Sequence, residues 1–223
     1  MEKIFVIGDI HACLNTLNEL LEHWNKDTEQ LIFVGDLIDR GNFSPETVSL
    51  VKKLVKNEDA VCLMGNHEYA CARAILEKNE LSWFRKMGDE TVLQYKKAGI
   101  KIKNDAKWFM SLPLIWQNGN IIISHAGISK KVLNPFEKND GEGVLWTRSE
   151  LKLYENKIQI HGHTPHFDNP SYNDKTNSWN IDSACVYDYF LTGIKFDISG
   201  KFIEKIRIPT NQKDIPKKYD LSE

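Results

Sequence analysis

Five short apolar runs in this chain are each followed at once by side chains of types that bind metal ions. In chain order, the runs and the residues after them are Ile4–Ile7 before Gly8-Asp9-Ile10-His11, Leu31–Val34 before Gly35-Asp36-Leu37-Ile38-Asp39-Arg40-Gly41, Ala60–Met64 before Gly65-Asn66-His67-Glu68, Ile121–Ser124 before His125-Ala126-Gly127, and Ile158–Ile160 before His161-Gly162-His163-Thr164-Pro165. Runs of this length and composition are typical of buried strands. Because ligands bind at the carboxyl ends of strands in open α/β sheets, the five loops are expected to converge on one site.

Helical patterns separate the early runs. Leu14–Trp24 has apolar residues at three- and four-residue spacing, and Pro45–Lys56 is expected to form a helix with Ser44 as its N-cap. A longer helical region is predicted over Glu68–Ser111, where aromatic residues are frequent. This order of elements predicts an α/β fold, a sandwich of mixed sheets flanked by helices, with the metal site at the carboxyl ends of the strands.

After Ile158 the pattern changes from alternating strands and helices to strands that follow one another. Three more strands are predicted at Asn180–Ile181, Leu191–Ile198 and Phe202–Ile208. Two segments rich in Asn, Asp, Gly, Lys and Pro, Lys131–Gly143 and Phe167–Ser178, are expected to be surface loops.

The length of 223 residues and 41% of apolar residues predict a single globular domain over residues 1–208, followed by a polar tail over 209–223. A formal net charge of −2 argues against a dedicated nucleic-acid surface. No run of eighteen apolar residues occurs and four cysteines form no C-x-x-C pair, so we expect no membrane association, reduced thiols and a cytoplasmic location.

The ligand types narrow the choice of metal. Imidazole combined with carboxylate and amide oxygen, without convergent thiolates, favours Mn, Fe, Zn, Co or Ni over Ca or a structural zinc, and Mn is our first expectation. A carboxylate can bridge two ions, and such a pair can deprotonate a water near neutral pH while it polarises a phosphoryl oxygen. The residues therefore predict phosphoester hydrolysis that depends on two divalent transition-metal ions.

Taken together, the five motifs resemble those of the phosphoprotein phosphatase branch of the calcineurin-like metallophosphoesterases. This branch includes compact phage and bacterial Ser/Thr protein phosphatases and diadenosine tetraphosphatases. The resemblance spans Gly8 to about Cys185 and keeps the order of the family's motifs. It implies the metallophosphoesterase β-sandwich and direct attack on phosphorus by a water that the metals activate.

The resemblance also implies roles for single residues. Asp9, His11 and His163 would hold the first metal, Asp36 would bridge the two ions, and Asn66 and His125 would complete the second site. His67 would protonate the leaving group without binding metal, and Asp39 would orient its imidazole. Arg40 would bind the non-bridging phosphate oxygens, with Arg148 as a second such residue in the segment Val144-Leu145-Trp146-Thr147-Arg148.

Some positions leave alternatives open. Ala12 stands where the family has glycine, so its methyl group could press on the loop or only restrict the backbone. His161 could be a neighbour of the metals or, if the chain turns at Gly162, lie apart from them. Trp83 and Phe84 could be core residues or cover a cleft, and Glu68 is expected to be a carboxylate at a helix N-terminus outside the site.

We expect a Ser/Thr protein phosphatase that acts on a phosphoprotein or a phosphorylated small molecule, because the segments expected to form the cleft walls, Glu68–Ser111 and Lys131–Arg148, contain no nucleotide-binding fingerprint such as a Gly-rich phosphate loop. The same metal chemistry also suits a hydrolase of diadenosine tetraphosphate or another dinucleoside polyphosphate, because the metal site does not select the leaving group. An alternative of another class is a catalytically silent metal-binding module. The presence of Asp39, Arg40, His67 and Arg148 argues against that alternative.

Overall fold

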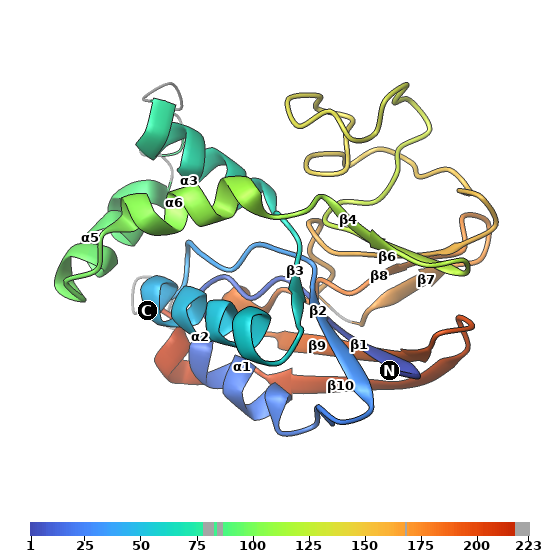
Figure 1. Cartoon of the computed structure of the whole chain (residues 1–223), viewed down its shortest axis with the longest axis horizontal. Helices are drawn as coiled ribbons and strands as arrows, with labels where there is room; N and C mark the ends of the chain where they lie inside the picture. Colours follow the sequence, from blue (N-terminus) through green and yellow to red (C-terminus); the bar gives the residue numbers. More distant parts are fainter. Residues whose placement is uncertain (78–82, 84–86, 168, 217–223) are drawn as a thin grey trace.

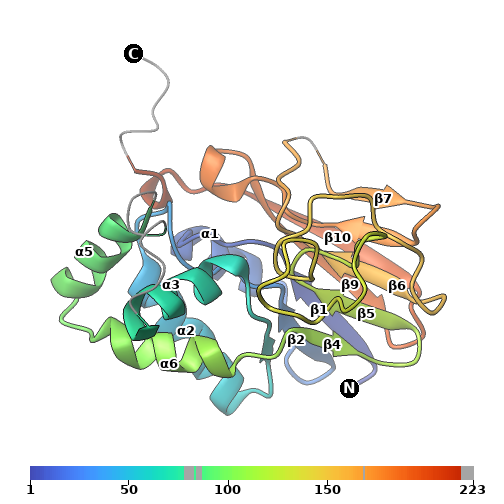
Figure 2. The ribbon, with the colours of Figure 1, turned by 90° about the horizontal axis from the view of Figure 1, so that it is seen from above.

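The computed structural model describes residues 1–77, 83, 87–167 and 169–216 and contains two five-stranded sheets (Figures 1 and 2). The first sheet has the strand order β10-β9-β1-β2-β3, and the second has the order β4-β5-β6-β8-β7. The strands of the first sheet are β1 (Lys3–Ile7), β2 (Glu29–Phe33), β3 (Val61–Cys62), β9 (Phe190–Asp197) and β10 (Phe202–Pro209). Those of the second are β4 (Ile115–Gln117), β5 (Ile121–Ser124), β6 (Ile158–His161), β7 (Ser171–Asn173) and β8 (Ser178–Asn180).

Strand alternation divides the apolar residues between two layers. In β1, Ile4 and Val6 face the second sheet and join a core with Ile123 and Ile160 from that sheet, whereas Phe5 and its neighbour Ile7 face the helices. On the helical side, α1 (Leu14–Leu21) packs against β9 and β10, and α2 (Ser44–Asn57) packs against β3. Farther from the sheet, α5 (Asp89–Lys97) packs against α2, and α3 (Asn66–Glu77) packs against α6 (Ile102–Ser111). The predicted α/β sandwich flanked by helices is therefore confirmed.

Parallel pairing aligns the strand ends that carry the motifs. In the first sheet β1 pairs with β2 and β2 with β3, all in parallel, and in the second sheet β6 lies parallel to both β5 and β8. The carboxyl ends of parallel strands meet at one edge of each sheet, and the two sheets face each other across a shared apolar core. The motif loops of both sheets thus come together at one end of the sandwich.

Two local predictions were wrong. Ser44 is the first residue of α2 rather than its N-cap, because its backbone N–H binds the Gln94 side chain and its hydroxyl accepts a hydrogen bond from the Asp39 N–H. The expected loop Phe167–Ser178 contains the edge strand β7, which pairs antiparallel with β8. β7 reads Ser-Tyr-Asn and exposes Tyr172, so it lacks the apolar alternation by which a buried strand is recognised.

The four cysteines are buried free thiols. Among the described residues, no helix combines the length and the apolar character that are needed to cross a membrane. The cytoplasmic location stays a prediction.

Part of the expected C-terminal tail is packed against α1. The short 3-10 helices are η2 (Cys185–Tyr187) and η3 (Gln212–Asp214), and η3 places Asp214 fully buried at the N-terminus of α1. One Asp214 carboxylate oxygen accepts the Asn15 N–H at 3.0 Å, and the other accepts the Thr16 N–H at 2.8 Å and the Thr16 hydroxyl at 2.7 Å. Because the residue before α1 makes no side-chain cap, Asp214 satisfies the first-turn N–H groups from 198 residues away in sequence.

We expect Asp214→Ala to lower the free energy of unfolding by about 2 kcal/mol, because it leaves buried donors without an acceptor. Chemical denaturation measures this difference. The matched control is Asp27→Ala at an exposed turn, which should change stability by less than about 0.5 kcal/mol. Equal stability of both variants would show that the tertiary cap contributes nothing.

Candidate metal centre

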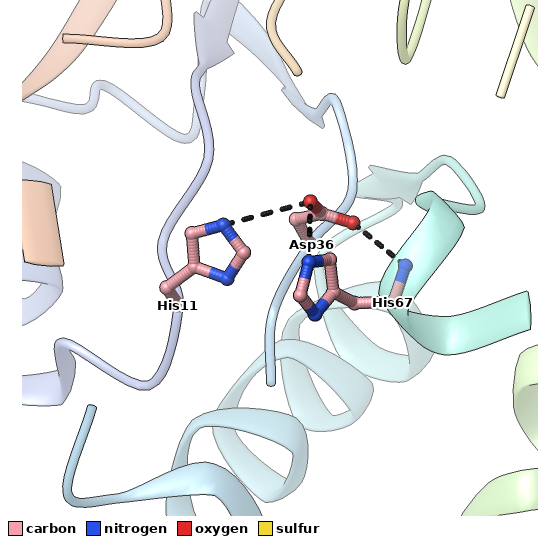
Figure 3. Close-up of side chains that lie close together, drawn as sticks. All are labelled: His11, Asp36 and His67. Carbon is pink, nitrogen blue, oxygen red and sulfur yellow. Dashed lines mark hydrogen bonds and ion pairs between the residues drawn. The ribbon is translucent and has the colours of Figure 1, made fainter. Parts of the chain in front are cut away.

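Asp36 lies at the centre of the site (Figure 3). Its side chain is buried, and one carboxylate oxygen lies 3.5 Å from His11 Nε2 and 3.8 Å from His67 Nε2. The other oxygen accepts the backbone N–H of His67 at 3.0 Å and lies 3.5 Å from His125 Nε2. Burial alone would raise the pKa of Asp36, but the surrounding histidines, His125 first, hold it well below its usual value.

Two groups of side chains that could hold a metal ion share this carboxylate. The first comprises His11, Asp36 and His67, and the second comprises Asp36, His125 and His163. Asn66 adds its side-chain oxygen to the second group, where it lies 2.8 Å from both His125 Nε2 and His163 Nδ1. Imidazole, carboxylate and amide oxygen form a ligand set that suits divalent transition metals. The donors therefore fit a pair of ions with Asp36 between them.

The position of His163 differs from the sequence-based assignment. His163 was expected to join Asp9 and His11, but its ring lies with Asn66 and His125, and only its backbone N–H binds the Asp9 carboxylate, at 3.1 and 3.2 Å. His163 follows Gly162 and has a φ of 70°, a left-handed backbone conformation. Gly162 is required there because a Cβ atom would lie 1.9 Å from the Asp9 carboxylate.

Asp9 is buried beside the first group but belongs to neither of the two groups. Burial, followed by the nearby carboxylates of Asp182 and Asp36, raises its pKa well above the usual value. Three buried carboxyl groups within interaction range of one another are costly without a cation. This charge arrangement is a second reason to expect metal ions here.

His67 is held by a buried carboxylate on the side away from Asp36. Its Nδ1 lies 2.7 Å from the Asp39 carboxylate, whose oxygens also accept hydrogen bonds from Trp83 Nε1 at 2.8 Å and from the Thr91 hydroxyl. Burial lowers the pKa of His67, but Asp36 and Asp39 more than offset this, so the pKa is raised. The imidazole is thus fixed in orientation and biased toward carrying a proton.

The two arginines flank the centre differently. Arg40 is half-buried, and its guanidinium nitrogens lie 2.5 Å from His11 Nε2 and 3.1 Å from His67 Nε2. Arg148 is exposed on the side of the second group, where its charge helps to lower the pKa values of His125 and His163. Arg40 therefore contacts the histidines of the centre directly, whereas Arg148 acts on them through its charge.

His161 belongs to neither metal-binding group. It lies on the outer face of β6 and lines a polar pocket of about 290 Å³ together with Arg148, His166 and Asn180. Burial lowers its pKa to about 4, so the ring is neutral near pH 7. The turn at Gly162 separates it from His163, which answers the question that the sequence left open.

Ala12 is buried with a φ of 60°, a left-handed conformation that favours glycine. Its backbone N–H donates to the Leu37 carbonyl and its carbonyl accepts the Phe43 N–H, so the loop is held on both sides. Of the two effects considered for Ala12, the structure therefore shows the restriction of the backbone conformation.

Glu68 has a larger role than the sequence predicted. Its carboxylate accepts the backbone N–H groups of Asp36 at 2.8 Å, Leu37 at 2.8 Å and Gly65 at 3.0 Å. Burial, followed by the charge of Asp36, raises the pKa of Glu68 to about 7. Glu68 thus fixes the loop that carries Asp36, which has a φ of 53°. The sequence signal that could have indicated this role is the position of Glu68 in the third motif, two residues after Asn66.

Trp83 and Thr91 are the other residues that the sequence did not assign. Trp83 is buried and supports Asp39 rather than covering a cleft, while Phe84 lies outside the described residues. Trp83 lies between α3 and α5 and Thr91 lies in α5, so both are more than forty residues from Asp39 in sequence. No pattern in the sequence links them to it.

The chain belongs to the calcineurin-like phosphoesterase family, whose model matches residues 2–198. Members of this family hydrolyse phosphoesters with divalent metal ions, and the two groups around Asp36 provide side chains for them.

A Geobacillus sp. (strain WCH70) protein named bis(5'-nucleosyl)-tetraphosphatase PrpE, asymmetrical, is 30% identical over 250 residues, covering 97% of this chain and 98% of that protein. Two solved structures share the fold with equal TM-scores of 0.63. One is described as a candidate diadenosine tetraphosphatase (20% identity, 95% of each chain covered). The other is a Saccharomyces cerevisiae protein Ser/Thr phosphatase similar to human PP5 (18% identity, 95% of this chain and 81% of that chain covered). The fold therefore does not distinguish the two substrate classes.

We expect Trp83→Phe to lower kcat for phosphoester hydrolysis by about tenfold, a fraction of the roughly 10²–10⁴-fold contribution of a general acid. The substitution removes the N–H donor to Asp39 and loosens His67, while the metal content measured by elemental analysis stays unchanged. Trp24→Phe is the matched control, since Trp24 Nε1 donates to the Glu29 carbonyl outside the site. A Trp83→Phe variant with normal kcat would contradict the positioning of His67 by Asp39.

Proposed function

We propose that this protein hydrolyses dinucleoside tetraphosphates asymmetrically, so that diadenosine tetraphosphate yields AMP and ATP. The observation that carries the chemistry is the pair of metal-binding groups that share Asp36, with Arg40 beside them. Support for the substrate comes from the Geobacillus relative, which carries this name and matches nearly the full length of both chains. The expected protein Ser/Thr phosphatase activity is supported only by a shared fold at 18% identity, which is weaker support than a relative at 30% identity.

In this proposal Asp9, His11 and Asp36 hold one ion, and Asp36, Asn66, His125 and His163 hold the other. Two such ions supply an activated water and polarise the phosphoryl oxygens. Mn is the expected metal, with Fe, Zn, Co or Ni as alternatives of the same ligand preference. His163 is assigned to the second ion rather than the first because its ring contacts the Asn66 side chain.

His67 is the proposed proton donor to the leaving phosphate oxygen. Asp39 accepts a hydrogen bond from His67 Nδ1–H, which directs Nε2 toward Arg40 and Asp36. The Arg40 guanidinium can only donate hydrogen bonds, so its contact requires Nε2 to be an acceptor and favours the neutral form of His67. The carboxylates of Asp36 and Asp39 favour the protonated form. A phosphate that draws Arg40 onto its own oxygens would leave Nε2 free to carry the proton.

The leaving group in this reaction is a nucleoside phosphate, and its protonation is the step that His67 assists. Arg40 and Arg148 bind non-bridging oxygens from opposite sides, because one lies at the first group and the other at the second.

We expect the purified, Mn-loaded protein to convert diadenosine tetraphosphate into equal amounts of AMP and ATP, resolved by ion-exchange chromatography. The kcat/KM should exceed that for a phosphoserine peptide by at least about tenfold, a difference of about 1.4 kcal/mol in transition-state binding. A chelator should stop turnover, since the proposed nucleophile is a water that the two ions activate.

Other outcomes would decide between the alternatives. Two ADP molecules as product would contradict asymmetrical cleavage, and faster turnover of the phosphopeptide would restore the protein phosphatase hypothesis. A protein that holds metal but turns over neither substrate would support the silent binding module.

A further inference from the structure

Three large aromatic side chains lie together on the surface. Phe167, Tyr187 and Tyr189 are 50%, 41% and 38% exposed. The Phe167 ring lies 6.2 Å from the Tyr187 ring and 5.2 Å from the Tyr189 ring, centroid to centroid. Aromatic rings with this much exposure do little for the core, and clustered apolar surface of this kind marks binding sites. We call these three residues the aromatic shelf.

The shelf is joined to the metal centre through Arg40. The Arg40 guanidinium carbon lies 5.8 Å from the centre of the Tyr187 ring, while its terminal nitrogens contact His11 and His67. A ligand whose phosphate lies at Arg40 therefore has the shelf as its next neighbour on that side.

The backbone beneath the shelf is well held. Tyr187 ends η2, a turn flanked by Ala184 and Asp188, both of which have left-handed backbone conformations. The Tyr189 carbonyl accepts the Thr210 N–H at 3.0 Å, and the Thr210 hydroxyl binds the Cys185 carbonyl at 2.6 Å. A rigid turn presents the two tyrosine rings without a large entropy loss on binding.

The polar pocket beside Arg148 has a different character. The described residues that line the polar pocket beside Arg148 include serine, threonine, asparagine and histidine but no phenylalanine, tyrosine or tryptophan. A flat apolar ring system finds aromatic partners on the Arg40 side and hydrogen-bonding groups on the Arg148 side. The two sides are therefore suited to different parts of one ligand.

We propose that the aromatic shelf stacks against one nucleobase of the substrate while Arg40 binds the adjoining phosphate. This inference rests on the proposed function and assigns the nucleobase to specific residues. Stacking on aromatic rings tolerates every base, because each base has a π-face. The shelf should therefore accept adenine and guanine alike.

The test compares the metal-loaded wild type with the double variant Phe167→Leu/Tyr189→Leu, which leaves the Tyr187–Arg40 contact in place. Calorimetry measures the binding of AMP, GMP and inorganic phosphate. We expect Kd for both nucleotides to rise about tenfold, within the range for one stacked base, and Kd for phosphate to stay within about twofold. The KM for diadenosine tetraphosphate should rise in parallel.

Tyr172→Leu is the matched control. Tyr172 on β7 is also 50% exposed, but its ring contacts Trp179 on β8 instead of Arg40. It should change none of these values. A nucleotide Kd that is unchanged in the double variant, or that rises no more than the phosphate Kd, would overturn the proposal. So would a loss of affinity confined to a phosphoserine peptide.

The binding experiment separates the two proposals. Failure of the proposed function appears in the wild type, as absence of diadenosine tetraphosphate cleavage. Failure of the shelf proposal appears only when the nucleotide Kd values of the variants and the wild type are compared. Those Kd values can be measured without substrate turnover.

Discussion

The site depends on a buried carboxylate that four imidazoles surround. Asp36 has a left-handed backbone conformation, and its pKa is held well below the usual value by His125, His67, His11 and His163. These histidines come from loops of both sheets, so the two halves of the sandwich must be in place before the cluster exists. Glu68 holds the Asp36 loop through three backbone N–H groups, and Gly65 leaves room for the Asp36 side chain. Packing and chemistry are therefore coupled at this residue.

Much of this arrangement could be predicted from the sequence, because alternation and strand ends are local signals. The strands at Ile4–Ile7 and Leu31–Val34 place their alternate residues in the two apolar layers as period-two patterning requires. The convergence of the five motif loops follows from parallel pairing. What could not be predicted depends on contacts between distant segments. Asp214 caps α1 across the length of the chain, and Trp83 and Thr91 support Asp39.

The place of His163 could not be predicted for a different reason. Sequence order puts it after the other ligands, but its ring contacts Asn66 while its backbone N–H binds Asp9, and the motif alone does not tell these two contacts apart. Substrate choice is also decided outside the motifs. A metal pair acts on phosphomonoesters and phosphoanhydrides alike, so discrimination falls to the walls around it. Those walls are apolar and aromatic beside Arg40 and polar beside Arg148. This asymmetry fits a ligand of which one nucleobase stacks beside Arg40 while its phosphates lie at the metal centre.

The most direct test of this account is to locate the metals in crystals of Mn-loaded protein by anomalous diffraction. The account predicts two peaks about 3.5–4 Å apart, each within bonding distance of the Asp36 carboxylate, with His11 beside one ion and His125 and His163 beside the other. A single ion, or two ions that do not share Asp36, would contradict it.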